Sequence, residues 1–245
     1  MSKSSSDLGI NRTGAGMSPV DAPRQAAGAA EAMPTSPGSA REFHALCATF
    51  LPDAPRIGSV PPPATVRGVV HAAVKAVQAE KPTVFLDALG ARLAFERMGA
   101  RLYEGVITKV TVARAGPPLE RLREIRAAEL RHFRLLRDTL VGLGADPTAV
   151  TPCADVAAVM STGVLQVVTD PRTTVAQTLD AVLVAELTDT DGWRLLVRLA
   201  EERGDTALAG AFRAAMLEEE RHVEAVRDWH TELVLAEAGL RERVH

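Results

Sequence analysis

Two copies of the pattern Glu-x-x-His constrain this chain more than any other feature of its sequence. The copies are Glu129 with His132, and Glu219 with His222. Because residues three apart lie above one another on one face of a helix, each copy would present a carboxylate beside an imidazole. An isolated acid, Glu96 or Glu186, precedes each copy by 33 residues. Two helical hairpins would therefore supply four carboxylates and two imidazoles, the donor set of a carboxylate-bridged two-metal centre in a four-helix bundle.

The spacing within one copy is weak evidence by itself, because the pattern also occurs by chance. A third copy, Glu242 with His245, lies in a charged C-terminal tail and has Ala209 at the upstream offset. The other two copies lie within long apolar-patterned stretches, and Glu96 and Glu186 each follow two apolar residues. A solvated glutamate would be out of place on such a face, so the duplicated copies favour a buried site.

Apolar residues at helical spacing predict four long helices. Their expected ranges are about 82–113, 119–143, 174–203 and 206–233. Pro82 suits a first helical turn, and Ala115-Gly116-Pro117-Pro118 ends the first helix. The connection 146–173 is long enough to carry the chain along the length of the bundle before the third helix begins. The chain is therefore predicted to be all-α.

The first part of the chain, residues 1–62, is rich in Ser, Gly, Pro and Ala and is predicted to be a flexible arm. Two apolar islands, Leu8-Gly9-Ile10 and the stretch 43–51, could dock on the bundle or on a partner. The first island resembles the short apolar tags by which some cargo proteins enter bacterial nanocompartments. Residues 65–80 predict a short amphipathic helix, so the bundle domain is expected to span residues 63–245.

Composition limits the classes of partner and compartment. The net charge is −3 and charged residues of both signs are mixed along the chain, which gives no electrostatic case for nucleic acid. Cys47 and Cys153 are too few for a four-cysteine zinc or iron site and favour a reducing compartment. The N-terminus lacks an apolar signal region, and no stretch of 18 uncharged apolar residues occurs. We therefore expect a cytoplasmic protein that does not span a membrane.

The donor types indicate which metals would bind. Carboxylate oxygens with imidazole suit iron or manganese, and open positions would remain for dioxygen or peroxide. We assign Glu96, Glu129 and His132 chiefly to one metal, and Glu186, Glu219 and His222 to the other. Glu129 and Glu219 are the candidates for bridging, and burying four acids without cations would be costly.

The two Glu and Glu-x-x-His segments also match, or differ, at further positions. Tyr103 and Trp193 each lie seven residues after the isolated acid, so Tyr103 could hydrogen-bond a ligand carboxylate or lie beside the oxidant, or belong to the core. Asp189 could be a seventh ligand, although its short side chain favours a surface position, and Gly99 occupies the matching offset. Some acids are expected to be solvated, namely Glu104, Glu218 and Glu220. The histidines without an acid three residues earlier are not expected to be ligands: His44, His71 and His230.

Residues 83–230 resemble the rubrerythrin-type branch of the ferritin-like superfamily. The matching positions are Phe95-Glu96-Arg97, Glu129-x-x-His132, Glu186 and Glu219-x-x-His222. The resemblance implies a ferritin-like bundle with a long crossover between its second and third helices. It also implies two irons that react with hydrogen peroxide or dioxygen. The chain departs from the pattern in lacking a four-cysteine rubredoxin domain, so peroxide reduction would need an external electron donor.

Three functions follow as hypotheses. The first is a di-iron oxidoreductase that oxidises Fe(II) or reduces hydrogen peroxide. The second is a di-iron oxidase or oxygenase acting on an organic substrate, which would need an apolar channel to the metals. The third is a non-catalytic helical binding or cargo protein that holds zinc or no metal. A homodimer formed through helix faces is compatible with each of them.

Overall fold

The computed structural model describes residues 18–32, 39–54, 58–61 and 82–241. Contacts divide the chain into two units, Lys3–Arg56 and Ile57–His245. The described residues form seven helices and no strand. The predicted all-α class is therefore confirmed for this part of the chain.

The first unit contains two helices that the sequence pattern did not predict. They are α1 (Asp21–Glu31) and α2 (Ala40–Phe50), and neither has a buried residue. The Ser39 side chain accepts a hydrogen bond from the backbone N–H of Glu42, which caps the start of α2. The apolar island 43–51 thus forms most of α2 and is largely exposed. Leu8-Gly9-Ile10 and the expected helix 65–80 lie outside the described residues.

Four long helices of the second unit match the predicted ranges to within four residues. They are α4 (Pro82–Ala113), α5 (Leu119–Gly142), α7 (Val175–Glu202) and α8 (Thr206–Glu237). Thr174 and Gln177 form a reciprocal capping box at the start of α7. The carboxylate of Asp205 accepts a hydrogen bond from the N–H of Leu208 and caps α8.

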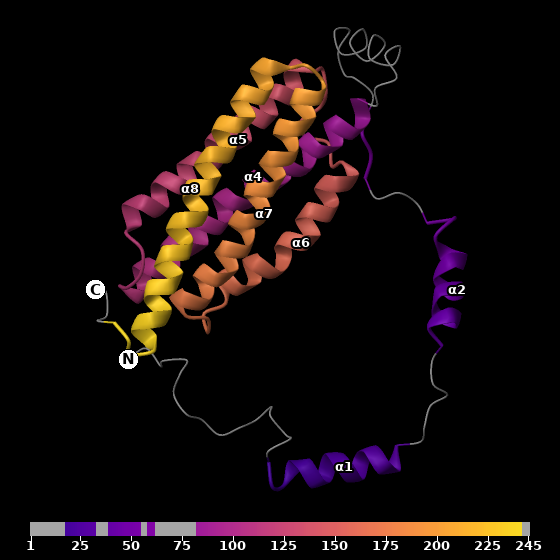
Figure 1. The fold of residues 1–245 in the computed structure, drawn as a ribbon, viewed down its shortest axis with the longest axis vertical. Coiled ribbons are helices and arrows are strands. Elements are labelled where there is room, and N and C mark those ends of the chain that lie inside the picture. The colour runs from indigo at the N-terminus through magenta and orange to yellow at the C-terminus, as the bar shows by residue number, and fades with distance from the viewer. Residues whose placement is uncertain (1–17, 33–38, 55–57, 62–81, 242–245) are drawn as a thin grey trace. The chain divides into compact units, whose positions relative to one another are not determined.

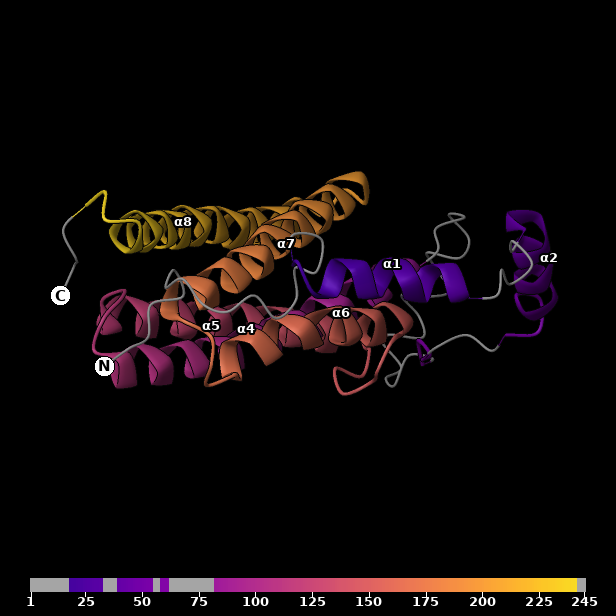
Figure 2. The same ribbon diagram turned by 90° about the horizontal axis from the view of Figure 1, so that it is seen from below.

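The connection between α5 and α7 is itself a helix, α6 (Pro152–Thr169), which the sequence analysis did not predict. At its start the backbone N–H of Cys153 donates to Asp87 of α4 at 2.8 Å. Beyond its end the ammonium group of Lys109 donates to the backbone oxygen of Asp170 at 2.8 Å. Since these contacts lie at two distant points of α4, α6 runs along that helix (Figures 1 and 2).

Within the described ranges, α6 is the one helix long and apolar enough to cross a membrane by length and composition. One such helix is weak evidence for a membrane span, although only 22% of α6 is buried in the structure, and Asp155 lies within it. In the fold α6 packs against α4 and α7. The expectation that the chain does not span a membrane stays a prediction.

The long helices enclose two apolar clusters, one toward each end of the unit. The first cluster contains Phe85, Leu89, Leu136, Leu140, Trp193, Leu196, Ala209 and Phe212. The second contains Leu102, Val106, Leu122, Ile125, Val168, Leu179, Val182 and Val226. The order of these residues along each helix shows that α4 and α8 run from the first cluster to the second, whereas α5 and α7 run in the opposite direction. Helix α6 returns the chain from one end of the unit to the other, because α5 ends and α7 begins at opposite ends.

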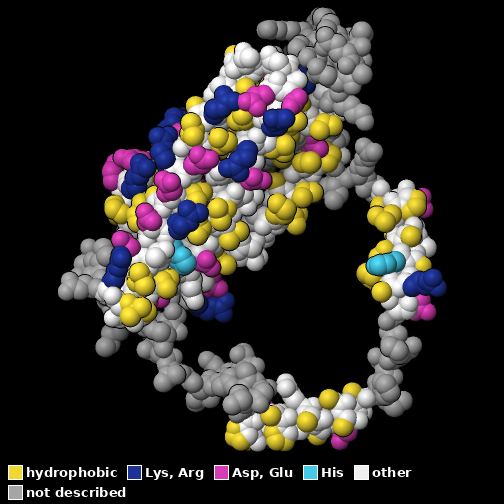
Figure 3. Space-filling model, viewed as in Figure 1, with side chains coloured by type: hydrophobic (Ala, Val, Ile, Leu, Met, Phe, Trp, Pro, Cys, Tyr) yellow, Lys and Arg dark blue, Asp and Glu magenta, His cyan; other side chains and the backbone are white. Residues whose placement is uncertain are grey.

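The outer face formed by α7 and α8 carries charges of both signs between apolar side chains (Figure 3). Arg194 pairs there with Asp191 at 2.9 Å and with Glu220 at 3.5 Å. Such exposed pairs contribute about 0–1 kcal/mol each, so the stability of this unit comes chiefly from its two buried clusters.

Candidate metal centre

A belt of buried polar side chains lies between the two apolar clusters. On α5, α7 and α8 the predicted ligands fall between the residues that enter one cluster and those that enter the other, and on α4 Glu96 directly follows Phe95, where the second cluster begins. All six predicted ligands are buried, with at most 4% of each residue exposed: Glu96, Glu129, His132, Glu186, Glu219 and His222. Apolar layers on both sides therefore separate these charged groups from water.

The structure brings all six predicted ligands together. One group with the spacing of a metal site contains Glu129, Glu186, Glu219 and His222. A second contains Glu96, His132 and Glu219, and a third contains Glu96, Glu129, Asp189 and Glu219. In each group the donor atoms lie within 4.8 Å of one another. Glu219 belongs to every group, as a bridging carboxylate would, and Glu129 and Glu96 each belong to two.

Both imidazoles turn the same nitrogen toward the acids. The Nδ1 atom of His132 lies 2.6 Å from Glu219 and 3.7 Å from Glu96. The Nδ1 atom of His222 lies 2.8 Å from Glu219, 3.8 Å from Glu129 and 3.9 Å from Glu186. A metal-binding imidazole coordinates through one nitrogen while the other holds a hydrogen-bond partner. His132 has this second contact, since its Nε2 atom lies 3.0 Å from Glu218.

Several of the buried acids present oxygen atoms without a hydrogen bond from the protein. Both carboxylate oxygens of Glu129 and Oε2 of Glu186 lack a hydrogen-bond donor. The oxygens of Glu96 have only ion-pair contacts, with Arg92 at 3.2 Å and His132 at 3.7 Å. An unpaired buried carboxylate is strongly unfavourable, and bound cations relieve this cost. The donor set and its orphaned oxygens therefore fit one or more hard divalent cations.

The pKa values show how strongly these acids disfavour being charged together. Burial raises the pKa of Glu129 well above its ordinary value, and repulsion by Glu219 and Glu96 raises it further. Burial and the charge of Glu219 likewise raise the pKa of Glu186. Two divalent cations would reverse this preference, because they stabilise the ionised carboxylates.

Glu219 and His132 behave differently, since they pair with each other. Burial opposes the charge on Glu219, yet hydrogen bonds from His132 and His222 lower its pKa to about 2. Burial also opposes the charge on His132, but its contacts with Glu219 and Glu96 raise its pKa to about 10. In the absence of a cation, the imidazolium of His132 is thus the nearest positive charge to Glu219.

One side of the cluster, which we call the tyrosine side, consists of Glu186, His222 and Tyr103. The Tyr103 hydroxyl donates a hydrogen bond to Oε1 of Glu186, and the residue is 1% exposed. Burial and the negative charge of Glu186 raise the pKa of Tyr103. Its contact suits the predicted role of holding a ligand carboxylate in place. Trp193 occupies the matching position on α7, and its indole nitrogen has no hydrogen-bond partner.

The opposite side, the arginine side, consists of Glu96, His132, Arg92, Asp189 and Glu218. The guanidinium of Arg92 lies 3.2 Å from Glu96 and 3.3 Å from the carboxylate of Asp189, and all three residues are at most 5% exposed. The preference for a surface position of Asp189 was therefore wrong. Its position on the inner face of α7, one turn after Glu186, outweighs the shortness of its side chain.

Sequence reasoning also missed the roles of Arg92 and Glu218. Arg92 lies four residues before Glu96, a spacing that places the two on one helix face and could have revealed the pair. Glu218 was expected to be solvated, but its side chain is only 30% exposed and contacts both His132 and Arg131. Glu104 is exposed and pairs with Arg126, as a surface acid does. His44 and His230 belong to none of the candidate metal groups, and His71 lies outside the described residues.

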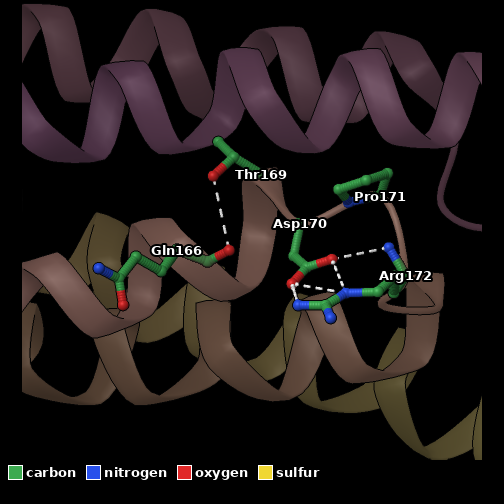
Figure 4. A pocket seen from close by; sticks show the side chains of 5 residues that line it. All are labelled: Gln166, Thr169, Asp170, Pro171 and Arg172. Carbon is green, nitrogen blue, oxygen red and sulfur yellow. Dashed lines mark hydrogen bonds and ion pairs between the residues drawn. The ribbon is translucent and has the colours of Figure 1, made fainter.

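A separate surface hollow lies where α6 leads into α7 (Figure 4). Gln166, Thr169, Asp170, Pro171 and Arg172 line it. The Asp170 carboxylate accepts hydrogen bonds from the backbone N–H of Arg172 and from its guanidinium, both at 2.9 Å. Since these two groups satisfy each other, the hollow offers no set of free donor atoms like that of the buried belt.

Comparisons with protein-family models, with curated proteins and with solved structures find no match to this chain.

Proposed function

We propose that this chain is a ferritin-like di-iron oxidoreductase that oxidises Fe(II) or reduces hydrogen peroxide at a carboxylate-bridged site. The observation that carries the proposal is the buried convergence of four glutamates and two imidazole Nδ1 atoms from four helices. The opposed helix directions and the connecting helix α6 are compatible with the crossover expected of a ferritin-like bundle.

The candidate ligands would form two metal positions. Glu96 and His132 would hold one ion, and Glu186 and His222 the other. Glu129 and Glu219 would bridge the two positions. Two ferrous ions held there would supply one electron each to a bound oxidant. Manganese or zinc could occupy the same donors.

The surroundings support such chemistry in two ways. The apolar clusters on either side exclude water, which strengthens every electrostatic interaction within the site. Tyr103 fixes the orientation of Glu186, and Glu218 does the same for His132. Electrons for continued peroxide reduction would come from an external donor, and we propose a cytoplasmic location.

Two measurements on the full chain test this function. The first is metal content after purification without added metal and after reconstitution with Fe(II) in the absence of oxygen. The second is stopped-flow absorbance after the Fe(II) form is mixed with oxygen or with hydrogen peroxide. We expect two irons per chain and rapid oxidation without an organic substrate.

The alternatives give different results in the same measurements. Slow oxidation that a small organic molecule accelerates would support an oxidase or oxygenase instead. Failure to hold iron after reconstitution would refute the proposed function and leave the non-catalytic helical protein.

A further inference from the structure

The strongest departure from the twofold repeat lies on the arginine side. The repeat relates residues 90 positions apart, as in Glu96 with Glu186 and Glu129 with Glu219. At three such pairs of positions the residues differ sharply in charge or size: Arg92 with Val182, Gly99 with Asp189, and Leu102 with Gly192. Three of these six residues lie close together in the structure, namely Arg92, Asp189 and Gly192.

The contacts of Arg92 define that place. Its Nη2 atom lies 3.3 Å from Oδ1 of Asp189, and its Nη1 atom donates to the backbone oxygen of Asp189 at 3.3 Å. Its Nε atom lies 3.2 Å from Glu96, and its guanidinium lies 4.1 Å from the centre of the Phe95 ring. Arg92 therefore joins α4 to α7 through a contact that holds both the side chain and the backbone of Asp189.

Two glycines provide the space that this arrangement needs. A Cβ atom at Gly192 would lie 2.0 Å from Nη1 of Arg92, so a side chain there would displace the guanidinium. A Cβ atom at Gly99 would lie 2.1 Å from Oε2 of Glu129. An acid at the position that matches Asp189 would thus displace the carboxylate of Glu129. Only α7 contributes a fifth fully buried carboxylate to the cluster, since Glu218 of α8 is partly exposed.

Counting charges shows what Arg92 changes. The four ligand glutamates carry four negative charges when ionised, which two divalent ions balance. Asp189 adds a fifth negative charge within reach of the metal positions, since it shares a candidate group with Glu96, Glu129 and Glu219. The guanidinium of Arg92 is always charged, and it supplies the one positive charge that the protein needs to match Asp189.

We propose that Arg92 is a positioning residue that holds Asp189 as its counter-ion and so withholds this carboxylate from the metals. The inference rests on the proposed function, because it requires that the cluster bind divalent ions. It makes the centre a four-carboxylate site for two divalent cations, with Asp189 outside the ligand set. The arginine side is thereby made different from the tyrosine side, where Val182 contributes no charge.

The first test is a double-mutant cycle on the metal-free chain, using Arg92→Met, Asp189→Asn and the double variant. Arg92→Met alone leaves the buried carboxylate of Asp189 without its partner. The melting temperature of this variant should therefore fall by roughly 10–15 °C. The double variant should recover part of that loss, because Asp189 no longer lacks its partner whereas Glu96 still does. A matched cycle with Arg194→Met and Asp191→Asn, an exposed pair on the same helix α7, should shift melting by at most about 4 °C.

The second test asks which groups bind the metals. Asp189→Asn should still bind two Mn²⁺ per chain, with affinities within about tenfold of the parent chain. With Co²⁺ as a probe, its visible spectrum should also match the parent. Arg92→Met should alter that spectrum, because the freed Asp189 can then coordinate. The Co²⁺ spectra of the double variant and of Arg92→Lys should both resemble that of the parent chain more closely than the spectrum of Arg92→Met does.

Two results would overturn the inference. One is a strictly additive cycle, in which the double variant loses as much stability as the two single variants combined. The other is loss of one bound ion in Asp189→Asn, which would make Asp189 a ligand. If Arg92→Met does not fold, Asp189→Asn and the double variant still decide the question. A parent chain that binds no divalent ion would instead refute the proposed function.

Discussion

The two sides of the buried cluster have the same donor types but different neighbours. On the tyrosine side, Glu186 accepts a neutral hydrogen bond from Tyr103. On the arginine side, Glu96 lies beside a guanidinium, and His132 contacts the partly exposed Glu218. The position that matches Glu218 in the repeat is Ala128, which carries no acid. A repeated sequence can therefore place equivalent candidate ligands while single residues around them give the two sides of the cluster unequal charge.

The largest effect should come from the carboxylates shared by both sides. We expect Glu219→Ala to abolish binding of both ions, and Glu129→Ala to do the same if it bridges, whereas Glu186→Ala should remove only the ion of the tyrosine side. Metal content per chain, measured after reconstitution and gel filtration, checks this prediction. Glu220→Ala, at the adjacent and partly exposed position, serves as the control. One ion retained at full occupancy in Glu219→Ala would show that this residue does not bridge.

The next largest effect concerns pH and the metal-free chain. Glu129 and Glu186 have raised pKa values in the folded state, so the folded chain binds more protons than the unfolded chain above about pH 4.5. Its free energy of unfolding should therefore fall as the pH rises toward neutrality. His132 adds to this fall between pH 6.5 and about 10, because its folded pKa is raised to about 10.

Metal should reverse this dependence, because protons compete with cations for the same carboxylates. Glu219, with a folded pKa of about 2, loses its stabilising effect only as the pH falls below 4.5. Urea unfolding at a series of pH values should thus give maximum stability of the metal-free chain in mild acid. A metal-free chain that becomes steadily more stable from pH 5 to pH 8 would contradict the placement of these acids.

A smaller effect should follow from Tyr103→Phe, which removes the hydrogen bond to Glu186. The metal-free chain should lose about 1–3 kcal/mol, because a buried carboxylate oxygen is left without its donor. Affinity should fall by about tenfold for one of the two ions, that of the tyrosine side. Stepwise Mn²⁺ titration followed by electron paramagnetic resonance separates the two binding steps. Equal weakening of both steps would mean that Tyr103 acts on the whole fold rather than on Glu186.

The smallest effect is expected from Glu218→Gln on the arginine side. Glu218 contacts the Nε2 atom of His132 but is partly exposed, so affinity for one ion should fall by at most about tenfold. Glu104→Gln, which alters an exposed acid paired with Arg126, should leave the affinity unchanged. The same titration tests both variants. An effect of equal size in the two would show that Glu218 does not support His132 as a ligand.

The sequence predicted the long helices from apolar residues at helical spacing, and the structure shows local signals at several of their ends. Pro82 starts α4, the capping residues Thr174 and Asp205 start α7 and α8, and Pro117 and Pro118 separate α4 from α5. Helix α6 was missed although it has a comparable start, with Thr151 as its cap and Pro152 in its first turn. Its many β-branched and small residues weaken the helical signal, and packing against α4 stabilises it instead.

The six candidate ligands were predictable from spacing, since the repeat of Glu and Glu-x-x-His is a local pattern on each helix. The partners of these ligands depend on how two helices meet. Arg92 reaches Asp189 across 97 positions of sequence, and Tyr103 reaches Glu186 across 83. The side-chain length of Asp189 suggested the surface, but the rotation of α7 decides its burial. No local pattern reveals that rotation to the accuracy of one residue.

The most direct test of the central claim is anomalous X-ray diffraction from crystals of the full chain loaded with Mn²⁺ or Fe²⁺. We expect two anomalous peaks per chain, roughly 3.5–4 Å apart, flanked by Glu129 and Glu219. One peak should lie next to Nδ1 of His132 and the other next to Nδ1 of His222. A map with no peak within this belt would contradict the account, as would metal bound only on the outer surface.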